Sequence, residues 1–568
     1  MLSATTNKRT PILSWFSDLI FITLLLGVFY AIWIGSNALF TPDEGRYSEV
    51  AREMVETGDY ITPRLNGVAF LDKPVLYYWL QASAIHLFGL KEWALRFWPA
   101  FIGVLGCIVT YLTGRTLFNR RAGIFSALIL ATCPLYYGAA HYANLDLEVA
   151  VLISICLMSA LVWIRTQRTS LLITAYVFSG LAFLTKGLIG LFFPAAIIGT
   201  WILLLGQWSL LKKLRLVTGL LIFVAITLPW YYLVQKANPQ FLHFFFVDQQ
   251  VSRFLTKGDF NNKTAIWFYL PIVLAGIFPW SIFVIQAVSQ KIKLVWQNRQ
   301  QHQTELFLLL WLCIIFAFFS IPKSKTIGYI LPIFPALALM IANYLDTQWN
   351  QVKSKGVAFG LVAYTILSAG IGTGALAAAH LMSVAPAMIP YLHCMAFVFF
   401  VSGIVIAYSL AKKKLLAKKI TSLFVTAVVF LLVVIASTSA INEKSIKPLA
   451  LEIKPALQSG DEVVTYFKYY QDLPIYLERR ITIVADWDAP DIAQNDNWLR
   501  EMWYGMPFQN TSEWLIREDI FWKKWNSGKR LFVLLNNNYL DRFSKNASGK
   551  IYKISQYNNV VLVSNKEV

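Results

Sequence analysis

Charged residues are scarce in this chain. Asp, Glu, Lys and Arg make up 14% of its 568 residues, whereas 57% of the residues are hydrophobic. A soluble domain carries roughly 25% charged residues. The scarcity excludes an ordinary soluble protein and predicts a polytopic membrane protein that is mostly α-helical.

Cysteine and histidine are few and scattered. None of the five cysteines lies beyond position 441 or forms a CxxC pair, and the six histidines include no HExxH group. The residues therefore predict neither a disulfide framework nor a dedicated metal site. We expect no required cofactor, and the sequence leaves open whether a divalent metal is used.

Acidic residues are outnumbered by basic ones, so the formal net charge is +19. This excess does not predict nucleic-acid binding, because it is concentrated in the apolar part of the chain. Residues 442–568 hold 17 Lys and Arg against 16 Asp and Glu. The remaining positive charge lies largely in short loops between apolar stretches, where it sets membrane topology.

Long apolar stretches dominate the first 441 residues. A membrane span needs about 20 apolar residues, and about 13 stretches qualify. The first is too long and too apolar for a cleaved signal peptide. The predicted spans are 13–35, 95–118, 122–140, 147–165, 170–185, 187–206, 215–234, 265–287, 305–321, 327–345, 357–380, 388–410 and 420–441.

The loops between these spans predict an orientation. With a cytoplasmic N-terminus, the inside segments hold 20 Lys and Arg, while the short outside loops hold only Lys186, Lys323 and Lys325. This is the positive-inside pattern of membrane proteins. The odd number of spans then places the C-terminal region outside the cytoplasm.

The predicted organisation has two domains. Residues 1–441 form the transmembrane domain, with long outer loops at 36–94 and 235–264. Residues 442–568 form a small periplasmic α/β domain, because strand-like runs at 462–467, 481–485, 531–535 and 560–563 alternate with helical or loop segments.

The first outer loop is predicted to contain two helices at the membrane interface. Thr41 would cap the first helix, with Pro42 at its first position, Glu44 completing a capping box and Gly58 ending it. Its apolar residues recur at helical spacing, which is typical of an interfacial amphipathic helix. Residues 75–90 form a second apolar helix that is too short to span.

Three acidic residues of the outer loops are candidates for catalysis. Asp43 and Glu44 are also explained by the preference for acids in a first helical turn. Asp146 lies in the second outer loop and is also explained as a helix cap. Because charges at a membrane surface are costly to organise, we expect these carboxylates to take part in chemistry.

Five cations on the outer side are candidates for binding a phosphate. Lys73 and Arg253 are also explained as anchors at helix ends. As a set, however, the cations favour an anionic lipid-phosphate ligand, since arginine offers bidentate geometry and lysine a point charge. The five residues are Lys73, Lys186, Arg253, Lys323 and Lys325.

The outer motifs resemble those of the lipid A aminoarabinose transferases, which belong to the GT-C group of polyprenyl-phosphate-dependent glycosyltransferases. The similar segments, in order, are Pro42-Asp43-Glu44-Gly45-Arg46-Tyr47, Gly58-Asp59-Tyr60, Asp72-Lys73-Pro74, Asp146, Leu184-Thr185-Lys186-Gly187, Arg253-Phe254 and the run from Lys325 to Pro332. The resemblance covers the whole membrane region.

The resemblance implies transfer of 4-amino-4-deoxy-L-arabinose or a related aminosugar. The donor would be linked to undecaprenyl phosphate, and the acceptor would be a lipid A phosphate at the periplasmic face. It also implies inversion at the anomeric carbon. The residues would divide into Asp43, Glu44 and Asp146 for catalysis, Lys73, Lys186, Arg253 and Lys325 for the donor phosphate, and Arg46, Tyr47 and Tyr329 for substrate binding.

Two other functions remain open at this point. A transferase of the same fold could act on a protein hydroxyl or another glycan, and would then need Asp43 as a base. A transporter of polyprenyl-linked glycans is the non-enzymatic alternative. Transporters place ionisable residues near the bilayer midplane and often contain repeats, whereas here the charges gather in outer loops and no repeat is visible.

Overall fold

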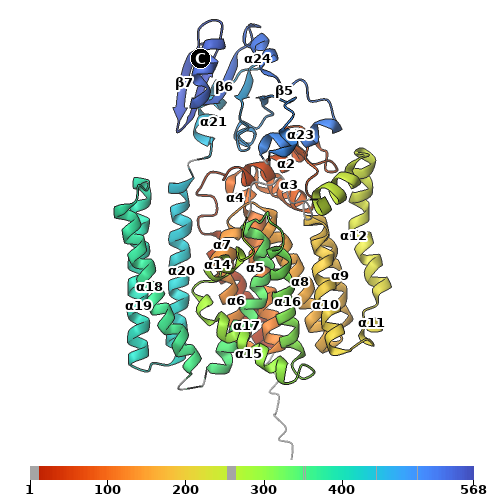
Figure 1. Ribbon diagram of the computed structural model, residues 1–568, viewed down its shortest axis with the longest axis vertical. Helices are drawn as coiled ribbons and strands as arrows, with labels where there is room; N and C mark the ends of the chain where they lie inside the picture. The colour runs from red at the N-terminus through yellow and green to blue at the C-terminus, as the bar shows by residue number, and fades with distance from the viewer. Residues whose placement is uncertain are drawn as a thin grey trace, which may run out of the picture.

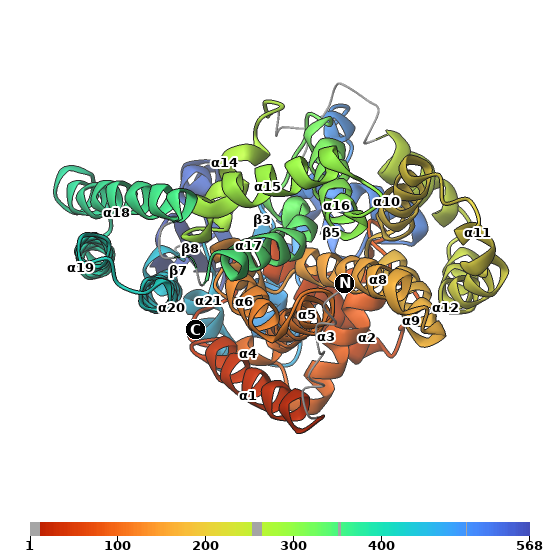
Figure 2. The ribbon, with the colours of Figure 1, turned by 90° about the horizontal axis from the view of Figure 1, so that it is seen from below.

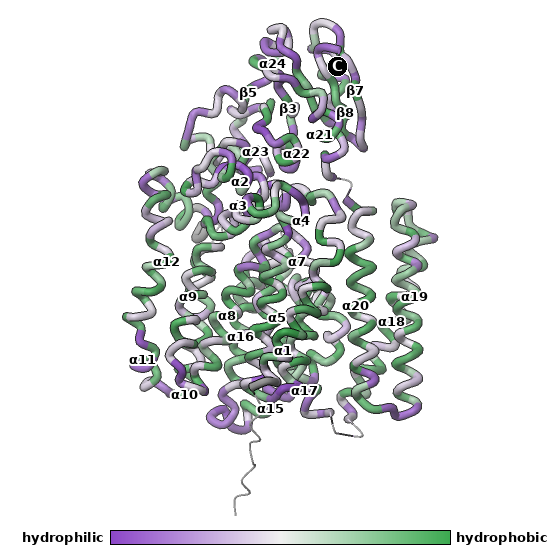
Figure 3. Tube along the Cα trace, turned by 180° about the vertical axis from the view of Figure 1, so that it is seen from behind, coloured by the Kyte–Doolittle hydropathy of each residue, from purple (hydrophilic) through white to green (hydrophobic). Residues whose placement is uncertain are grey.

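The protein consists of one layer of long helices with a smaller sheet domain on one side of it (Figure 1). The computed structural model describes residues 12–252, 264–349, 351, 354–442, 444–495 and 497–567. Apolar residues fill the middle of the layer and hydrophilic ones concentrate at its two ends (Figure 3). This distribution is that of a multi-pass membrane protein.

Ten helical segments of the described residues are long and apolar enough to cross a membrane. They are α1 (Ile12–Ala31), α4–α5 (Glu92–Leu117), α8 (Leu145–Thr166), α9 (Thr169–Lys186), α12 (Leu216–Ala237), α16 (Gln303–Ser320), η3–α17 (Ile327–Gln348), α18 (Lys355–Leu381), η4–α19 (Pro386–Ala411) and α20 (Leu416–Ile441).

Two bent pairs of helices account for two more of the predicted spans. Helices α6 (Arg120–Ala131) and α7 (Pro134–Ala140) meet at 66°, and α14 (Tyr269–Gly276) meets the η2–α15 segment (Trp280–Gln297) at 107°. Pro134 opens α7 and Pro279 precedes η2. Proline breaks a helix because it lacks the backbone N–H and its ring clashes with the preceding turn.

The thirteenth predicted span corresponds to α10 (Ile189–Leu205), which is shorter than the other candidates. Each predicted stretch therefore contains a helix. By length and composition, ten described helices qualify as spans, or up to twelve with the bent pairs, and the shorter α10 accounts for the thirteenth prediction. Helix α8 is central, with 89% of its apolar window buried, compared with 28% for α1. The short helix α11 (Leu210–Lys213) precedes α12, and the π-helix η1 (His243–Ser252) follows it.

The segment between α1 and α4, residues 32–91, is called the outer segment. It lies on the side of the layer that carries the sheet domain (Figure 1). It contains α2 (Asp43–Thr57), the hairpin β1–β2 (Arg64–Leu65 and Val68–Ala69) and α3 (Leu76–Phe88). Gly58 ends α2 as predicted: it has φ 69° and its N–H bonds to the Met54 carbonyl at 3.0 Å. Glycine adopts this left-handed conformation without the strain that a side chain would cause.

The predicted capping box at the start of α2 is wrong. The helix begins at Asp43, Pro42 occupies the N-cap position, and no side chain caps the helix. The Thr41 hydroxyl bonds instead to the Lys444 carbonyl at 3.3 Å. Glu44 accepts the Phe40 N–H at 2.8 Å rather than the N–H of Thr41, which the box requires.

The C-terminal domain is built on a six-stranded sheet. Its strands are β3 (Glu462–Tyr466), β4 (Thr482–Val484), β5 (Leu515–Ile516), β6 (Leu531–Asn536), β7 (Tyr552–Tyr557) and β8 (Val560–Ser564), in the order β5-β4-β3-β6-β8-β7. The pairs from β5 to β6 are parallel, and β8 and β7 continue antiparallel. The four predicted strands are confirmed as β3, β4, β6 and β8.

Short helices surround the sheet. They are α21 (Lys447–Ile453), α22 (Leu473–Leu477), α23 (Trp498–Gly505), α24 (Glu518–Trp525) and α25 (Leu540–Asn546). Helix α21 follows the linker from α20, α22 contacts α2, and α23 lies near the β1–β2 hairpin. These helices place the sheet domain directly over the outer segment (Figure 1).

The sheet domain and α3 bury α2, which the sequence predicts as an amphipathic helix lying in the membrane interface. Glu49, Val50 and Ala51 of α2 are fully buried. Asn66 joins the hairpin to the sheet domain by two hydrogen bonds of 3.0 Å with the Ile481 backbone, one donated and one accepted. The apolar face of α2 therefore packs within protein, in one core that continues into the sheet.

Candidate functional site

A cavity of about 400 Å³ lies where the helical layer, the outer segment and the sheet domain meet. Its walls come from the first turn of α2, the loop before α3, the start of α8, the end of α9, η3 and α23. The lining side chains used below are Asp43, Arg46, Tyr47, Asp72, Lys73, Asn144, Asp146, Lys186, Tyr329, Trp498, Glu501 and Tyr504. Seven of the ten residues that the family resemblance assigns to the site therefore share one cavity.

The two predicted catalytic aspartates each stand at the beginning of a helix. Asp43 is the first residue of α2, and Asp146 is the second residue of α8. The cap of α8 is Asn144, whose side chain accepts the Asp146 N–H at 2.8 Å. The carboxylate of Asp146 is therefore not used as the helix cap and faces the cavity, where the positive end of the helix dipole favours its charge.

Asp146 forms an ion pair with Lys186, which comes from the last turn of α9. The Lys186 ammonium also lies 4.0 Å from the ring centroid of Tyr329, a cation–π distance. The Asp146 carboxylate can lie this close to η3 because residue 328 is a glycine. A Cβ added there would lie 2.3 Å from Oδ2 of Asp146. One predicted carboxylate, one predicted cation and one predicted aromatic residue thus form a single contact group.

Asp43 is held on the other side of the cavity by Arg46. Their Nη2 and Oδ1 atoms lie 2.5 Å apart, and Arg46 also pairs with Glu501 of α23. Burial by itself would lower the pKa of Arg46, but Glu501, Tyr47 and Asp43 raise it above its ordinary value. The guanidinium therefore stays charged and links the outer segment to the sheet domain.

Tyr47 lines the same cavity with its ring buried. Burial raises the pKa of Tyr47 well above its ordinary value, so the phenol stays protonated at neutral pH. Tyr142 adds a second phenol, whose hydroxyl lies 3.5 Å from Oδ2 of Asp43. These groups offer hydrogen bonds to a ligand and do not act as bases.

Glu44 lines neither of the two cavities that include Asp43. Its carboxylate is fully buried and makes two bonds with Arg96, Nε to Oε1 at 2.8 Å and Nη2 to Oε2 at 2.6 Å. The Ala143 N–H donates to Oε1 at 2.7 Å. The structure thus separates Glu44 from its neighbour Asp43, although the sequence places both in the catalytic set.

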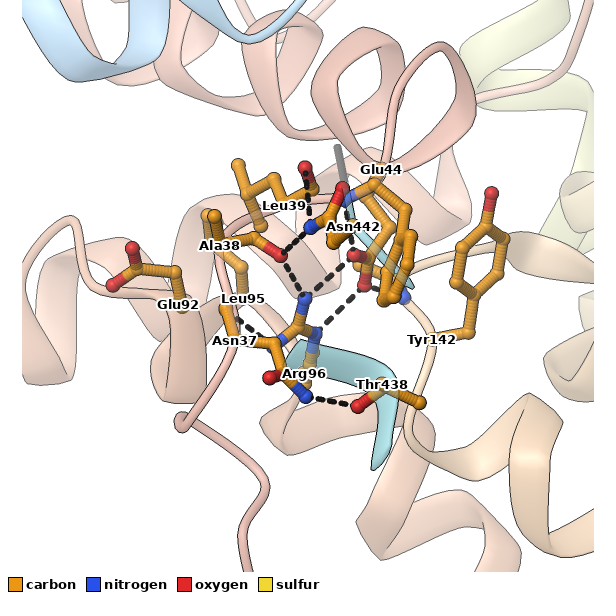
Figure 4. A network of polar contacts seen from close by, with 12 residues as sticks. Asn37, Ala38, Leu39, Glu44, Glu92, Leu95, Arg96, Tyr142, Thr438 and Asn442 are labelled. Carbon is orange, nitrogen blue, oxygen red and sulfur yellow. Dashed lines mark hydrogen bonds and ion pairs between the residues drawn. The ribbon is translucent and has the colours of Figure 1, made fainter. Parts of the chain in front are cut away.

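Arg96 binds the turn after α1 as well as Glu44 (Figure 4). Its Nη1 donates to the carbonyls of Ile34 at 3.1 Å and Asn37 at 3.0 Å, and its Nη2 to that of Ala38 at 3.0 Å. The amide of Asn442, just beyond α20, donates to the same Ala38 carbonyl at 2.9 Å. This network fixes the backbone on which Asp43 and the 142–144 loop stand.

The predicted phosphate-binding cations do not all reach the cavity. Lys73 and Lys186 line it, and Nζ of Lys73 donates to the Asp72 carbonyl at 3.1 Å. Lys325 is buried away from it and donates to the carbonyls of Thr264 at 3.3 Å and Ala265 at 3.2 Å. Burial lowers the pKa of Lys325. Arg253 lies outside the described residues.

A second cavity of about 450 Å³ adjoins the first. The two share Asp43, Asn144, Asp146 and Thr326. The walls of the second cavity are largely apolar and come from the turn after α1 and from α7, η3 and α20. A polar chamber is therefore joined to an apolar one, and two carboxylates stand between them.

Sequence reasoning missed the wall contributed by the sheet domain. Glu501, Trp498 and Tyr504 lie on α23, far from the outer segment in sequence, and no motif marks them. Within the part of the chain that the structure describes, no group of three or more His, Cys, Asp or Glu residues is placed to hold a metal ion.

The family described as dolichyl-phosphate-mannose-protein mannosyltransferase matches residues 72–233. Similar curated proteins include the undecaprenyl phosphate-alpha-4-amino-4-deoxy-L-arabinose arabinosyl transferases of Erwinia tasmaniensis and Pectobacterium carotovorum. Each is 32% identical to this chain. The first alignment covers 60% of this chain and 63% of the relative, and the second covers 62% and 65%. The matched part thus spans less than two thirds of the length of these relatives.

The likeness of fold is more extensive. The crystal structure of ArnT from Cupriavidus metallidurans bound to undecaprenyl phosphate superimposes with a TM-score of 0.80 at 25% identity, and covers 98% of this chain and 99% of that one. The resemblance expected from the outer motifs is confirmed. The chain is similar in sequence to the undecaprenyl phosphate–aminoarabinose arabinosyltransferases and has the GT-C fold of ArnT.

Proposed function

We propose that this protein is an integral-membrane glycosyltransferase that moves an aminoarabinose or related aminosugar from undecaprenyl phosphate to a phosphate of lipid A. The observation that carries the proposal is the shared cavity. Asp43 and Asp146 stand between a polar and an apolar chamber, with Lys73 and Lys186 in the polar wall. The names of the similar proteins supply the donor and the sugar.

The leaving group is the carrier phosphate, and its negative charge rises as the bond from the anomeric carbon to the phosphate oxygen breaks. Preorganised cations in a site with little water stabilise such charge well. We assign this task to Lys73 and Lys186, which line the cavity. The sequence predicts the same task for Arg253. Lys325, whose ammonium faces backbone carbonyls, is assigned to holding η3 against the 264–265 segment.

The acceptor phosphate oxygen attacks the anomeric carbon from the opposite face, and undecaprenyl phosphate departs with the bonding electrons. No proton has to be removed, since the acceptor is already anionic. The ion pair of Asp43 with Arg46 fits this role, because it holds the carboxylate in place to orient the substrates. Asp43 and Asp146 then orient the substrates and stabilise positive charge on the sugar ring.

The two chambers suit lipid-linked substrates. The apolar chamber takes the first isoprene units or an acyl chain, while the polar chamber takes the sugar and phosphates. Arg46, Tyr47 and Tyr329 line the polar chamber and are proposed to contact the sugar. Glu44 is proposed to position this wall through Arg96 rather than to touch the substrate.

The proposed location is the bacterial inner membrane, with a cytoplasmic N-terminus and the sheet domain in the periplasm. The Lys and Arg residues of the short loops support this orientation. The two-domain organisation, with a boundary near residue 441, is part of the same proposal. It places the cavity at the periplasmic face, where both lipid substrates are within reach.

A transferase that acts on a protein hydroxyl is the second candidate. The family match over residues 72–233 is the observation that favours it. A hydroxyl acceptor requires a base, and Asp43 would have to fill that role despite its pairing with Arg46. The pH profile of the parental protein separates the two: a steep loss of rate on acidification indicates a hydroxyl acceptor, whereas a flat profile indicates a phosphate acceptor.

The direct test is reconstituted transfer. Purified protein in proteoliposomes is supplied with aminoarabinosyl undecaprenyl phosphate and lipid A on one face only, and the product is identified by mass spectrometry. We expect lipid A to gain one aminosugar in the parent and in Lys91→Ala, an exposed lysine outside the cavity. No product from the parent, or product only when translocation is possible, would contradict the proposal.

A further inference from the structure

A third cavity, of about 520 Å³, lies at the end of the helical layer opposite the sheet domain. Four helix ends converge around it: the end of α17, the start of α18, the end of α19 and the start of α20. In Figure 1 these ends lie at the side of the layer opposite α2 and α23, which line the first cavity. The cavity shares no lining residue with either of the two cavities described above.

Four lysines line this cavity, and no acidic residue does. They are Lys355, Lys413, Lys414 and Lys419. The sequence holds no Asp or Glu between Asp346 and Glu443, so the helices and loops of this region supply no carboxylate. Among the described residues, none of the four lysines forms an ion pair with another side chain. The cavity is therefore a concentrated positive site without a counterion of its own.

The rest of the wall is largely apolar, with Gln348, Gln351 and Ser354 as its other polar residues. Trp349, Val357, Ala358, Leu410, Leu415 and Leu416 line it beside the lysines. Topology alone requires basic residues in the loop, but it does not require them to surround a cavity with an apolar wall. Four ammonium groups next to hydrocarbon match a ligand with an anionic head and an apolar tail. Basic pockets between membrane helices bind the head groups of acidic lipids in this way.

We propose that this cavity binds an acidic phospholipid from the leaflet opposite the sheet domain. The head-group phosphate is held among Lys355, Lys413, Lys414 and Lys419, and an acyl chain lies along Val357, Leu410 and Leu416. In the orientation proposed above, this is the cytoplasmic leaflet. The site is separate from the transfer reaction and does not depend on which sugar is moved.

The place of the cavity suggests what the lipid does. Helices α18 and α19 stand at the edge of the layer, where they pack on each other and α19 packs on α20 (Figure 2). Lys355 begins α18, Lys413 and Lys414 lie in the loop between α19 and α20, and Lys419 lies in the first turn of α20. A bound phosphate reduces their mutual repulsion and ties the start of α18 to the α19–α20 connection.

The test uses the purified full chain in neutral detergent. Native mass spectrometry measures the binding of phosphatidylglycerol, phosphatidylcholine and inorganic phosphate to the parent and to three variants. The first variant carries Lys→Gln changes at all four lysines, and two double variants change Lys355 with Lys419 or Lys413 with Lys414. The matched control changes Arg168, Lys212, Lys213 and Arg215 to Gln. These residues are exposed cations that do not line the cavity.

We expect the parent to prefer phosphatidylglycerol over phosphatidylcholine, and the quadruple variant to lose at least about tenfold in affinity, since each lysine strengthens attraction to an acidic lipid. The control variant keeps the parental affinity. If the quadruple variant does not fold, each double variant must still show a clear loss.

Three results would overturn the proposal. Equal losses in the quadruple and control variants would show attraction to surface charge in general. Equal binding of phosphatidylglycerol and phosphatidylcholine would show no recognition of the head group. Binding of inorganic phosphate as tight as that of the lipid would show an anion site without a role for the acyl chain.

Discussion

Arg96 holds Glu44 through two nearly parallel hydrogen bonds in the interior of the protein, with side chains 2% and 0% exposed. The same guanidinium binds three carbonyls of the turn after α1, and the same carboxylate binds the N–H of Ala143. One ion pair therefore joins three segments of the outer wall. Asp43 and Asp146 stand on two of these segments.

Arg96→Ala is predicted to destabilise the protein by about 3–5 kcal/mol, because it leaves the buried Glu44 carboxylate without its partner. Arg96→Lys should restore only part of the loss, since an ammonium cannot reproduce the two parallel bonds. Thermal unfolding of the purified protein measures both. As a control, Lys454→Ala breaks the exposed pair with Glu478 and should cost at most about 1 kcal/mol. Equal effects of Arg96→Ala and Lys454→Ala would contradict the account.

Glu44→Gln is predicted to keep measurable transfer, whereas Asp43→Asn is not. Glu44 lines neither cavity, and a glutamine keeps one acceptor for the Ala143 N–H. Asp43 faces both chambers, so loss of its charge acts on the reacting sugar directly. Initial rates at saturating donor, compared at equal folded protein, distinguish the two. If the rate of Glu44→Gln were as low as that of Asp43→Asn, Glu44 would have to be counted among the catalytic residues.

Lys73→Ala is predicted to abolish transfer while leaving expression and membrane insertion intact. The lysine lines the polar chamber, and its proposed role is to neutralise the carrier phosphate. Lys73→Arg should keep part of the activity, because a guanidinium is bulkier than an ammonium. Lys91→Ala, an exposed residue of the same outer segment, serves as the control and should be nearly silent. If Lys73→Ala transferred sugar at the parental rate, the proposed role of Lys73 in binding the carrier phosphate would be wrong.

Separating the Asp146–Lys186 pair is predicted to raise KM for the donor and to lower kcat. Lys186→Gln removes a cation from the polar wall and leaves Asp146 without its partner. Asp146→Asn leaves the ammonium over the Tyr329 ring, but without a carboxylate at the reaction centre. The double variant should then lose less than the sum of the two single losses, because the residues are in direct contact. If the double variant lost the full sum of the two single losses, Asp146 and Lys186 would act independently of each other.

Asp472 is predicted to make stability depend on pH. Burial raises the pKa of this carboxyl from 3.8 to about 6, in spite of hydrogen bonds from Ser445 and the Ile446 N–H. The folded protein therefore binds the proton more tightly than the unfolded chain, so stability falls as pH rises from about 4 to 6 and stays low above that. The loss amounts to about 3 kcal/mol, at about 1.4 kcal/mol for each unit of pKa.

The variant Asp472→Asn should flatten this dependence. It should raise the Tm relative to the parent at pH 8, and the difference should shrink as the pH falls from 6.5 toward 5. Thermal unfolding across this range measures it. A parallel shift at every pH would show that the carboxyl is not the titrating group.

Much of the layer could be predicted from the sequence, because the requirement for about 20 apolar residues per span leaves a signal that is readable locally. Four of the six strands of the sheet domain were equally readable, whereas β5 and β7 were missed. The exact number of spans was not, since bends at Pro134 and Pro279 depend on how neighbouring helices pack. The burial of α2 was missed for a similar reason: an amphipathic helix shows an apolar face in its sequence, but not what covers that face.

The site was predictable as a set of residues but not as a geometry. Asp43 and Glu44 are adjacent in sequence, yet successive residues on a helix point in different directions, and only Asp43 reaches the cavity. Lys186 and Lys325 look equivalent as outer-loop cations, but one pairs with Asp146 and the other with backbone carbonyls. Glu501 could not be found at all, because only tertiary folding brings α23 to Arg46.

The central claim is that this chain transfers an aminosugar to lipid A, and mass spectrometry of lipid A from cells tests it most directly. Lipid A is compared between cells that lack the gene, cells that carry it and cells that carry Asp43→Asn, with equal amounts of protein in the membrane. The account predicts lipid A heavier by one aminosugar only with the parental chain. Lipid A of unchanged mass under conditions that supply the donor, with the protein present and folded, would contradict it.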